Sequence, residues 1–129
     1  MVTPAQGITR FAELLREGLT ELPGSSNSEA LQAERDARNY ERSKDYASAI
    51  TALKRAVSLD PSFCRAWILL GETHDVTKDT RSALNDFQKA VDADPKQVLP
   101  YKILAFLYMA GGLQGDAIAI WQKLQSVAP

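Results

Sequence analysis

The chain has 129 residues, with 15 basic and 16 acidic side chains, 45% hydrophobic residues, one cysteine and one histidine. One cysteine cannot form an internal disulfide, and one cysteine with one histidine cannot supply the four ligands of a structural zinc site. A net charge of −1 gives no global field that attracts nucleic acid or an anionic membrane. We therefore expect a single soluble domain with no metal, no cofactor, no nucleic-acid partner and no membrane partner.

Residues 1–24 are predicted to form an amphipathic helix with a tail. Its apolar face is formed by Ile8, Phe11, Ala12, Leu15, Leu19 and Leu22. The start of the chain has no basic stretch before an apolar run, so no export signal is indicated and a cytoplasmic location is expected. Residues 25–29 are a predicted linker, in which Ser26 and Glu29 can form a capping box for the next helix. Three placements of the amphipathic helix stay open. It caps the alanine-rich face of Ala30, Ala33 and Ala37, it lies in a groove of its own or a neighbouring chain as a ligand mimic, or it binds a partner or a membrane surface.

Residues 30–129 repeat with a period of 34. The step relates Asp60-Pro61 to Asp94-Pro95, and a further step reaches Pro129. It also relates Ala49, Ala83 and Ala117, as well as Leu53, Phe87 and Trp121. A fixed period of this length is typical of stacked repeat architectures. The predicted units are residues 30–63, 64–97 and 98–129.

Each unit contains two apolar patterns of helical period, separated by a short turn at 44–45, 78–79 or 111–112. In the middle unit, Trp67, Leu70, Gly71 and His74 form one stripe, and Ala83, Phe87 and Ala90 form the other. The small residues let the two helices approach closely. Pro61 and Pro95 end the second helices, because proline disfavours a helical conformation in the preceding residue. Each unit is therefore a helical hairpin.

These residues resemble the tetratricopeptide repeat (TPR) family, whose pattern is W-x2-L-G-x2-Y, then A-x3-F, then P. The middle unit matches it with Trp67, Leu70, Gly71, Ala83, Phe87 and Pro95, and departs at His74. The third unit also matches, whereas the first departs at Asp36. The resemblance implies an all-α fold, an α-solenoid of three antiparallel helix pairs with the N-terminal amphipathic helix added. It also implies a concave groove, lined by the first helix of each pair, that binds peptides or protein segments.

By this resemblance the groove positions are Leu31, Glu34, Arg38, Glu41 and Arg42 in the first unit, Arg65, Ile68, Leu69, Glu72 and Asp75 in the second, and Leu99, Lys102, Ile103, Phe106 and Met109 in the third. The partner-binding residues are predicted to be Arg38, Arg42, Arg65, Leu69, Glu72, Leu99, Lys102, Ile103 and Phe106. An apolar anchor at Phe106 and carboxylate recognition by the arginines are expected, although Glu34 can instead pair with Arg38 four residues later.

Two other functions are argued against. Repeats that bind the acidic C-terminal tails of heat-shock chaperones use a clamp of lysine, asparagine and arginine, and the corresponding positions here hold Glu34, Arg38, Leu69, Leu99 and Ile103. Cys64 and His74 lie ten residues apart on one predicted helix, or about 15 Å at ~1.5 Å per residue. They cannot form a catalytic pair there, and no enzyme is expected.

The third unit carries only Lys102, Asp116 and Lys123 as charges from Val98 onward. Repeat arrays usually end in a polar cap. Two explanations are that the chain is part of a longer protein or that this face self-associates into a homo-oligomer. The predicted function is a noncatalytic protein-interaction module that acts through its groove. The alternative is a structural or assembly region of a larger protein, including an enzyme, or a self-associating scaffold that acts through the uncapped C-terminal face.

Overall fold

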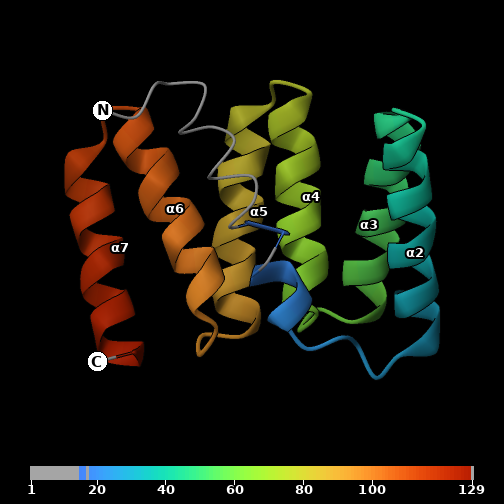
Figure 1. Cartoon of the computed structure of the whole chain (residues 1–129), viewed down its shortest axis with the longest axis horizontal. Coiled ribbons are helices and arrows are strands. Elements are labelled where there is room, and N and C mark those ends of the chain that lie inside the picture. Colours follow the sequence, from blue (N-terminus) through green and yellow to red (C-terminus); the bar gives the residue numbers. More distant parts are fainter. Residues whose placement is uncertain (1–14, 17, 129) are drawn as a thin grey trace.

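The computed structural model describes residues 15, 16 and 18–128, and every regular element in that part of the chain is helical. Helices α2 (Ser28–Arg42) and α3 (Tyr46–Leu59) form the first antiparallel pair, α4 (Cys64–Val76) and α5 (Thr80–Ala93) the second, and α6 (Val98–Ala110) and α7 (Gln114–Val127) the third. The pairs stand in a row, as Figure 1 shows. This arrangement confirms the predicted fold class.

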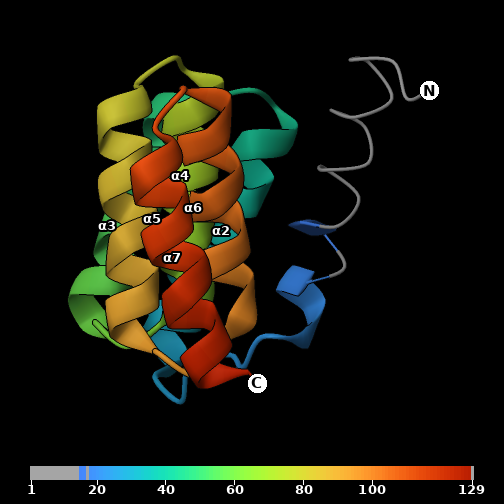
Figure 2. The ribbon, with the colours of Figure 1, turned by 90° about the vertical axis from the view of Figure 1, so that its left-hand side faces the viewer.

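The first helices of the pairs lie on one side of the row. Turning the molecule shows α2, α4 and α6 toward the side on which the N-terminal helical residues pack, while α3, α5 and α7 lie on the other side (Figure 2). We call residues 15, 16 and 18–22 the N-terminal segment; 15, 16 and 18–21 are helical. Ile8, Phe11 and Ala12 of the predicted amphipathic face lie outside the described residues.

The core follows the 34-residue pattern of small and large side chains. Ala49 and Ala83 have no exposed surface, and Leu53 and Phe87 are 0% and 3% exposed. A Cβ atom placed on Gly71 would lie 2.7 Å from Cε1 of Phe87 on the paired helix. Because this distance is far below van der Waals contact, only glycine permits such a close approach of α4 and α5.

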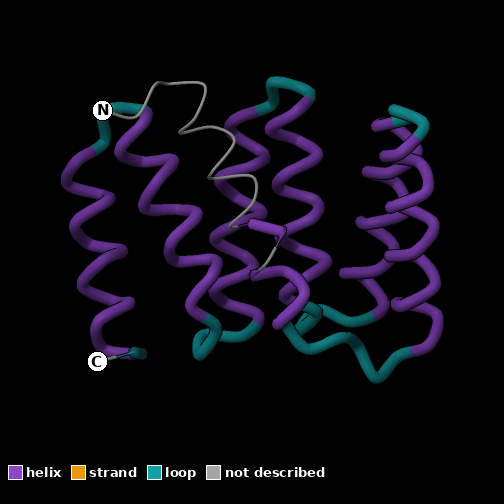
Figure 3. The backbone as a smooth tube through the Cα atoms, in the orientation of Figure 1, coloured by secondary structure: helices purple, strands orange, loops and turns teal. Residues whose placement is uncertain are grey.

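Short loops connect all six of these helices (Figure 3), and the turns between paired helices share one geometry. Lys44 and Lys78 have positive φ angles of 60° and 69°, and Gly112 occupies the same repeat position with φ 77°. Asp45 and Asp79 cap α3 and α5 by accepting hydrogen bonds from backbone N–H groups three residues later. The helices α3 and α5 end one residue before Asp60-Pro61 and Asp94-Pro95, as the prolines predict.

The start of α2 differs from the prediction. Asn27, not Ser26, is the N-cap, and its Oδ1 atom accepts hydrogen bonds from the N–H groups of Glu29 and Ala30 at 3.0 and 3.1 Å. The helix begins at Ser28, so Asn27 is the residue directly before it, and asparagine caps as well as serine does. Ser25 turns away and donates a hydrogen bond to Asp60 at 2.5 Å. This bond ties the linker to the loop between the first two helix pairs.

Candidate functional site

A cavity of about 640 Å³ lies between the N-terminal segment and α6. Apolar side chains of α6 form most of one wall, and the N-terminal segment forms the other. The cavity is lined by Leu15, Gly18, Glu21, Leu22, Lys96, Gln97, Val98, Leu99, Lys102, Ile103, Phe106, Met109 and Trp121. It opens on the face of the first helices, where the family resemblance places the groove.

The N-terminal segment packs into this groove by its leucines. Leu15, Leu19 and Leu22 are only 6%, 7% and 5% exposed, whereas Arg16 and Thr20 between them are exposed. A Cβ atom on Gly18 would lie 2.8 Å from both methyl carbons of Leu99, so the segment and α6 are in close contact. The three leucines are thus removed from water where the segment packs on the repeats.

Of the three placements that the sequence leaves open, capping of the alanine-rich face of the first repeat is therefore wrong for the described residues, which lie in the groove of their own chain. Ala30, Ala33 and Ala37 are 0%, 4% and 1% exposed and belong to the main core, where α2 packs against α3. That face is already covered within the helix pair. The segment lies beside α6 and α4 instead: Leu15 and Leu22 line the cavity together with residues of α6, and Arg65 of α4 reaches the carbonyl oxygen of Leu22.

A buried ion pair joins α2, α4 and the N-terminal segment. Arg65 donates two hydrogen bonds to the Glu34 carboxylate, Nε to Oε2 at 2.5 Å and Nη2 to Oε1 at 2.7 Å. Its guanidinium also lies 5.5 Å from the ring centroid of Phe63 and contacts the carbonyl oxygen of Leu22 at 3.5 Å. The side chains of Arg65 and Glu34 are 17% and 5% exposed. Arg65 is thus bound within the chain, and its contact with an external carboxylate stays a prediction.

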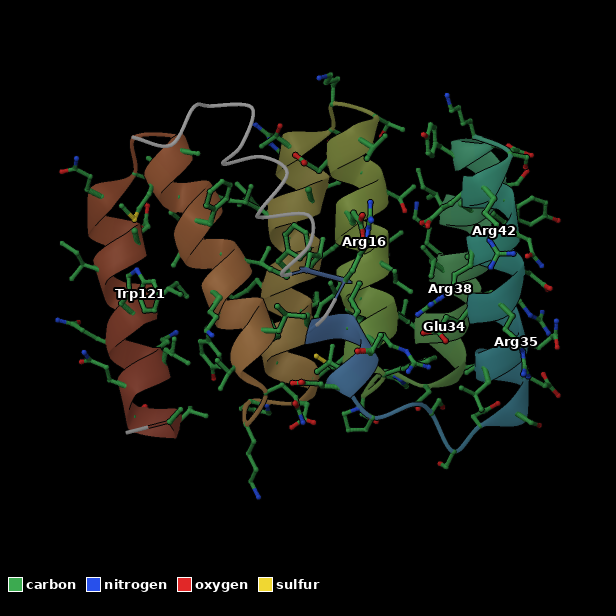
Figure 4. All side chains as sticks on the ribbon, in the orientation of Figure 1. Arg16, Glu34, Arg35, Arg38, Arg42 and Trp121 are labelled. Carbon is green, nitrogen blue, oxygen red and sulfur yellow. The ribbon has the colours of Figure 1, made fainter. Side chains whose placement is uncertain are left out.

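Arginines that remain at the surface line α2. Figure 4 shows Arg35, Arg38 and Arg42 along this helix. Arg38 contacts Glu34 at 3.8 Å, as the four-residue spacing predicts, and its side chain is 43% exposed. Arg42 is exposed and donates a hydrogen bond to Asn39 at 3.2 Å. These two predicted site residues stay accessible to solvent.

Acidic side chains gather between α2 and α4. Glu41 accepts a hydrogen bond from the hydroxyl of Thr73 at 2.6 Å, which links the first two repeats. Burial raises the pKa of Glu72 above its ordinary value, and the charges of Glu41 and Asp75 raise it further, while Arg16 and Arg38 oppose the shift. Arg16 of the N-terminal segment is thus close enough to interact with Glu72. Figure 4 shows Arg16 in front of α4.

The remaining predicted groove residues divide between core and surface. Leu69 and Ile103 are 5% and 1% exposed and belong to the core beneath the groove, as does Ile68 at 0%. Leu99 is half-buried against Gly18, whereas Lys102 is exposed and Phe106 is 44% exposed at the cavity. The residues that line the accessible groove are therefore fewer than the predicted ones.

A second buried polar pair lies inside the middle repeat. His74 Nδ1 is 2.5 Å from Asp86 Oδ2, and the two residues are 8% and 4% exposed. The sequence pattern places His74 in the core as a replacement for tyrosine, but it does not reveal Asp86 as its partner. The sequence does contain a signal for a buried role of Asp86, because its repeat counterparts are the apolar Ala52 and Ile120.

Other chemistry finds no support in the described residues. Burial raises the pKa of the Cys64 thiol to about 12, so a reactive thiolate is not present at neutral pH. No group of three or more metal-ligating side chains occurs among residues 15, 16 and 18–128. In the same part of the chain, no helix is long and apolar enough to cross a membrane.

The outer face of α7 exposes a second apolar surface. Leu113 and Ile118 are 47% and 57% exposed, and Trp121, which also lines the cavity beside α6, is 42% exposed. Trp121 is the repeat counterpart of Leu53 and Phe87, which are buried. In the first two pairs, the next repeat covers the second helix, since α4 packs on α3 and α6 packs on α5.

The comparisons with known proteins agree with this architecture. A family model described as tetratricopeptide repeat matches residues 37–63 and 65–97. Anaphase-promoting complex subunit 3 of Schizosaccharomyces pombe is 23% identical over 93 residues, which make up 72% of this chain and 14% of that protein. The chain thus spans a small part of that relative.

Solved structures show the same fold. MamA superposes with a TM-score of 0.68 at 21% identity, covering 76% of this chain and 57% of that one. The second TPR of Spaghetti (RPAP3), bound to the HSP90 peptide SRMEEVD, gives a TM-score of 0.65 at 11% identity, covering 89% and 98%. At these identities the likeness concerns the fold alone. Together with the repeat pattern and the helix pairs, these matches show that the chain belongs to the tetratricopeptide repeat family, whose arrays are protein-interaction modules.

Proposed function

We propose that the chain is a noncatalytic interaction module that binds a segment of a partner protein in the groove along α6. The observation that carries the proposal is the cavity of about 640 Å³ on the face of the first helices, lined in part by Leu15 and Leu22 of the chain's own N-terminal segment. A groove that buries three leucines of this largely helical segment offers the apolar surface that helix-in-groove recognition uses.

Affinity in this proposal comes from apolar contacts on α6. Leu99 and Phe106 line the cavity, and Met109 beside them is 60% exposed. Large apolar side chains that become fully desolvated on binding supply most of the free energy at protein interfaces. Lys102, exposed at the same wall, contributes charge selectivity rather than affinity.

Recognition of an acidic chaperone tail is not supported by these residues. Of the positions that would form the clamp, Glu34 is paired with Arg65, while Leu69 and Ile103 are buried and apolar. Arg38 alone offers an accessible cationic donor among them. Glu41, Glu72 and Asp75 place negative charge nearby, which favours a ligand with a basic group over an acidic one.

A second candidate is an assembly role for the outer face of α7. The exposed Leu113 and Ile118 carry it, because their surface is apolar and the corresponding surface of α5 is covered by α6. Either a further repeat or a second copy of the chain would cover this face in the same way.

One experiment separates the two candidates. Affinity capture from a cell lysate would compare the native chain with Phe106→Glu in the groove and with Ile118→Glu on α7, a matched apolar-to-acidic control at a similarly exposed position. Circular dichroism would establish that both variants fold. We expect a captured protein that is lost with Phe106→Glu and kept with Ile118→Glu. A protein that is kept with Phe106→Glu and lost with Ile118→Glu would instead support the assembly role of α7.

A further inference from the structure

The N-terminal segment contacts the groove through a defined spacing. Leu15 and Leu19 stand at positions i and i+4 of the helix, so they share one face, and Leu22, at i+7 in the sequence, follows directly after its last turn. Each is at least nine-tenths buried. Gly18, at i+3, faces α6 at a point where Leu99 leaves no room for a side chain. The contact therefore requires three leucines and one small residue.

The polar contacts of the segment are few. Arg65 reaches the carbonyl oxygen of Leu22 at 3.5 Å, the outer limit for a hydrogen bond. Arg16, at i+1, lies close enough to Glu72 to interact with its charge. The linker that follows is largely exposed at Pro23, Gly24 and Ser26. The segment is thus held mainly by its leucines.

The segment also leaves apolar surface of the groove uncovered. Phe106 is 44% exposed and Met109 is 60% exposed beside it, and both line the remaining cavity of about 640 Å³. A helix with larger apolar side chains beyond the three leucine positions would bury this surface as well. Such a helix gains contacts that the internal segment lacks, and this gain lets it displace a segment that is tethered to the chain.

Building on the proposed groove function, we propose that the N-terminal segment is an internal competitor for the groove. The external ligand is then an amphipathic helix with leucines at i, i+4 and i+7, a glycine at i+3, and a basic residue at i+1. Since the competent, open groove is only a fraction of the molecules, the apparent affinity for such a helix is reduced by that fraction.

A reversible disulfide tests the competition directly. The ideal Cβ of Gly18 lies 3.2 Å from Cγ of Leu99. The Cβ atom of Leu99 is no nearer than this, because only its two methyl carbons are closer to the Gly18 Cβ than Cγ is. One further carbon–carbon bond of about 1.5 Å puts the two Cβ atoms about 3.2–4.7 Å apart, and disulfides need about 3.5–4.5 Å. Gly18→Cys with Leu99→Cys in the full chain therefore locks the segment in place when oxidised. Native Cys64 is buried and does not compete.

The probe is a fluorescein-labelled peptide of residues 8–24, and fluorescence anisotropy measures its affinity. We expect the oxidised chain to be cross-linked within single molecules and to bind the peptide at least ten-fold more weakly than the same chain after reduction. Equal affinity in both states, or a cross-link that forms between two chains, overturns the proposal. A reduced chain that does not bind the peptide also overturns it.

A second variant leaves Leu99 in place. Leu19→Glu should release the segment and bind the peptide at least ten-fold more tightly than the native chain, whereas Ser26→Glu, an exposed linker change of the same charge, should bind like the native chain. Unchanged affinity in folded Leu19→Glu contradicts internal competition. Capture of a partner through Phe106 would still support the groove function in that case, so the two proposals fail separately.

Discussion

Replacing Arg65 with methionine would leave the carboxylate of Glu34 buried without its two short hydrogen bonds. The side chain of Glu34 is 5% exposed, and that of Arg65 is 17% exposed. Removing one member of a buried ion pair costs about 3–5 kcal/mol, because the other charge stays in a poorly solvated site. Arg38, at 3.8 Å, remains as a weaker partner for Glu34. We therefore expect a loss at the lower end, about 3 kcal/mol.

The free energy of unfolding, measured by urea titration with far-UV circular dichroism, gives this loss directly. For a domain of this size, about 1 kcal/mol corresponds to about 3–4 °C in Tm, so Tm should fall by about 10 °C. Glu34→Gln combined with Arg65→Met removes both charges and should be more stable than Arg65→Met alone. The reasoning is refuted if Arg65→Met stays within about 1 kcal/mol of the native chain, or if the double variant loses the sum of the two single losses.

Four further changes test separate parts of the structure. Gly71→Ala should cost about 1–3 kcal/mol in urea unfolding, despite a better helix propensity, because its Cβ meets the ring of Phe87 at 2.7 Å; no loss would contradict the close approach. The pKa of Glu72 is raised by burial, so the folded state binds more protons than the unfolded state just above pH 4.5, and stability falls as pH rises through that window. Glu72→Gln should remove this fall, measured as the native-minus-variant difference. Lys78→Gly should raise the urea midpoint, because φ at Lys78 is 69°, where glycine is unstrained. Leu113→Asn should raise the free energy of unfolding by about 1 kcal/mol, since α7 lacks a side-chain cap. An unchanged urea midpoint would argue against the positive φ angle in Lys78→Gly and against the missing cap in Leu113→Asn.

The repeat architecture could be predicted because its signals are local. Small residues such as Ala49 and Ala83, and the Asp-Pro pairs at 60–61 and 94–95, mark helix contacts and helix ends within each unit. These features act over a few residues, so the sequence displays them directly. The helix pairs and their turns then follow from the repeated pattern.

The partners of the buried charges could not be predicted in this way. Glu34 was expected to pair with Arg38 by the helical spacing, but the packing of α4 on the first pair brings Arg65 to a bidentate contact. Spacing rules describe one helix, whereas this pair joins two. The same reason hides the contact of His74 with Asp86 on α5.

The site of the N-terminal segment was also not determined by its sequence. An amphipathic pattern shows which face of a helix is apolar, but not which surface covers it. The alanine face of α2 is buried within its own helix pair. The N-terminal segment contacts α6 instead, where Gly18 packs against Leu99.

The central claim is that the groove along α6 is the binding surface. The most direct test places a photo-crosslinking benzoyl-phenylalanine at position 106 in one sample and at position 118 in another, in the full chain, and irradiates each in a cell lysate. Phe106 lies at the cavity, and Ile118 lies on the outer face of α7. The account predicts a specific protein adduct from position 106 and none from position 118. An adduct from position 118 alone would contradict it.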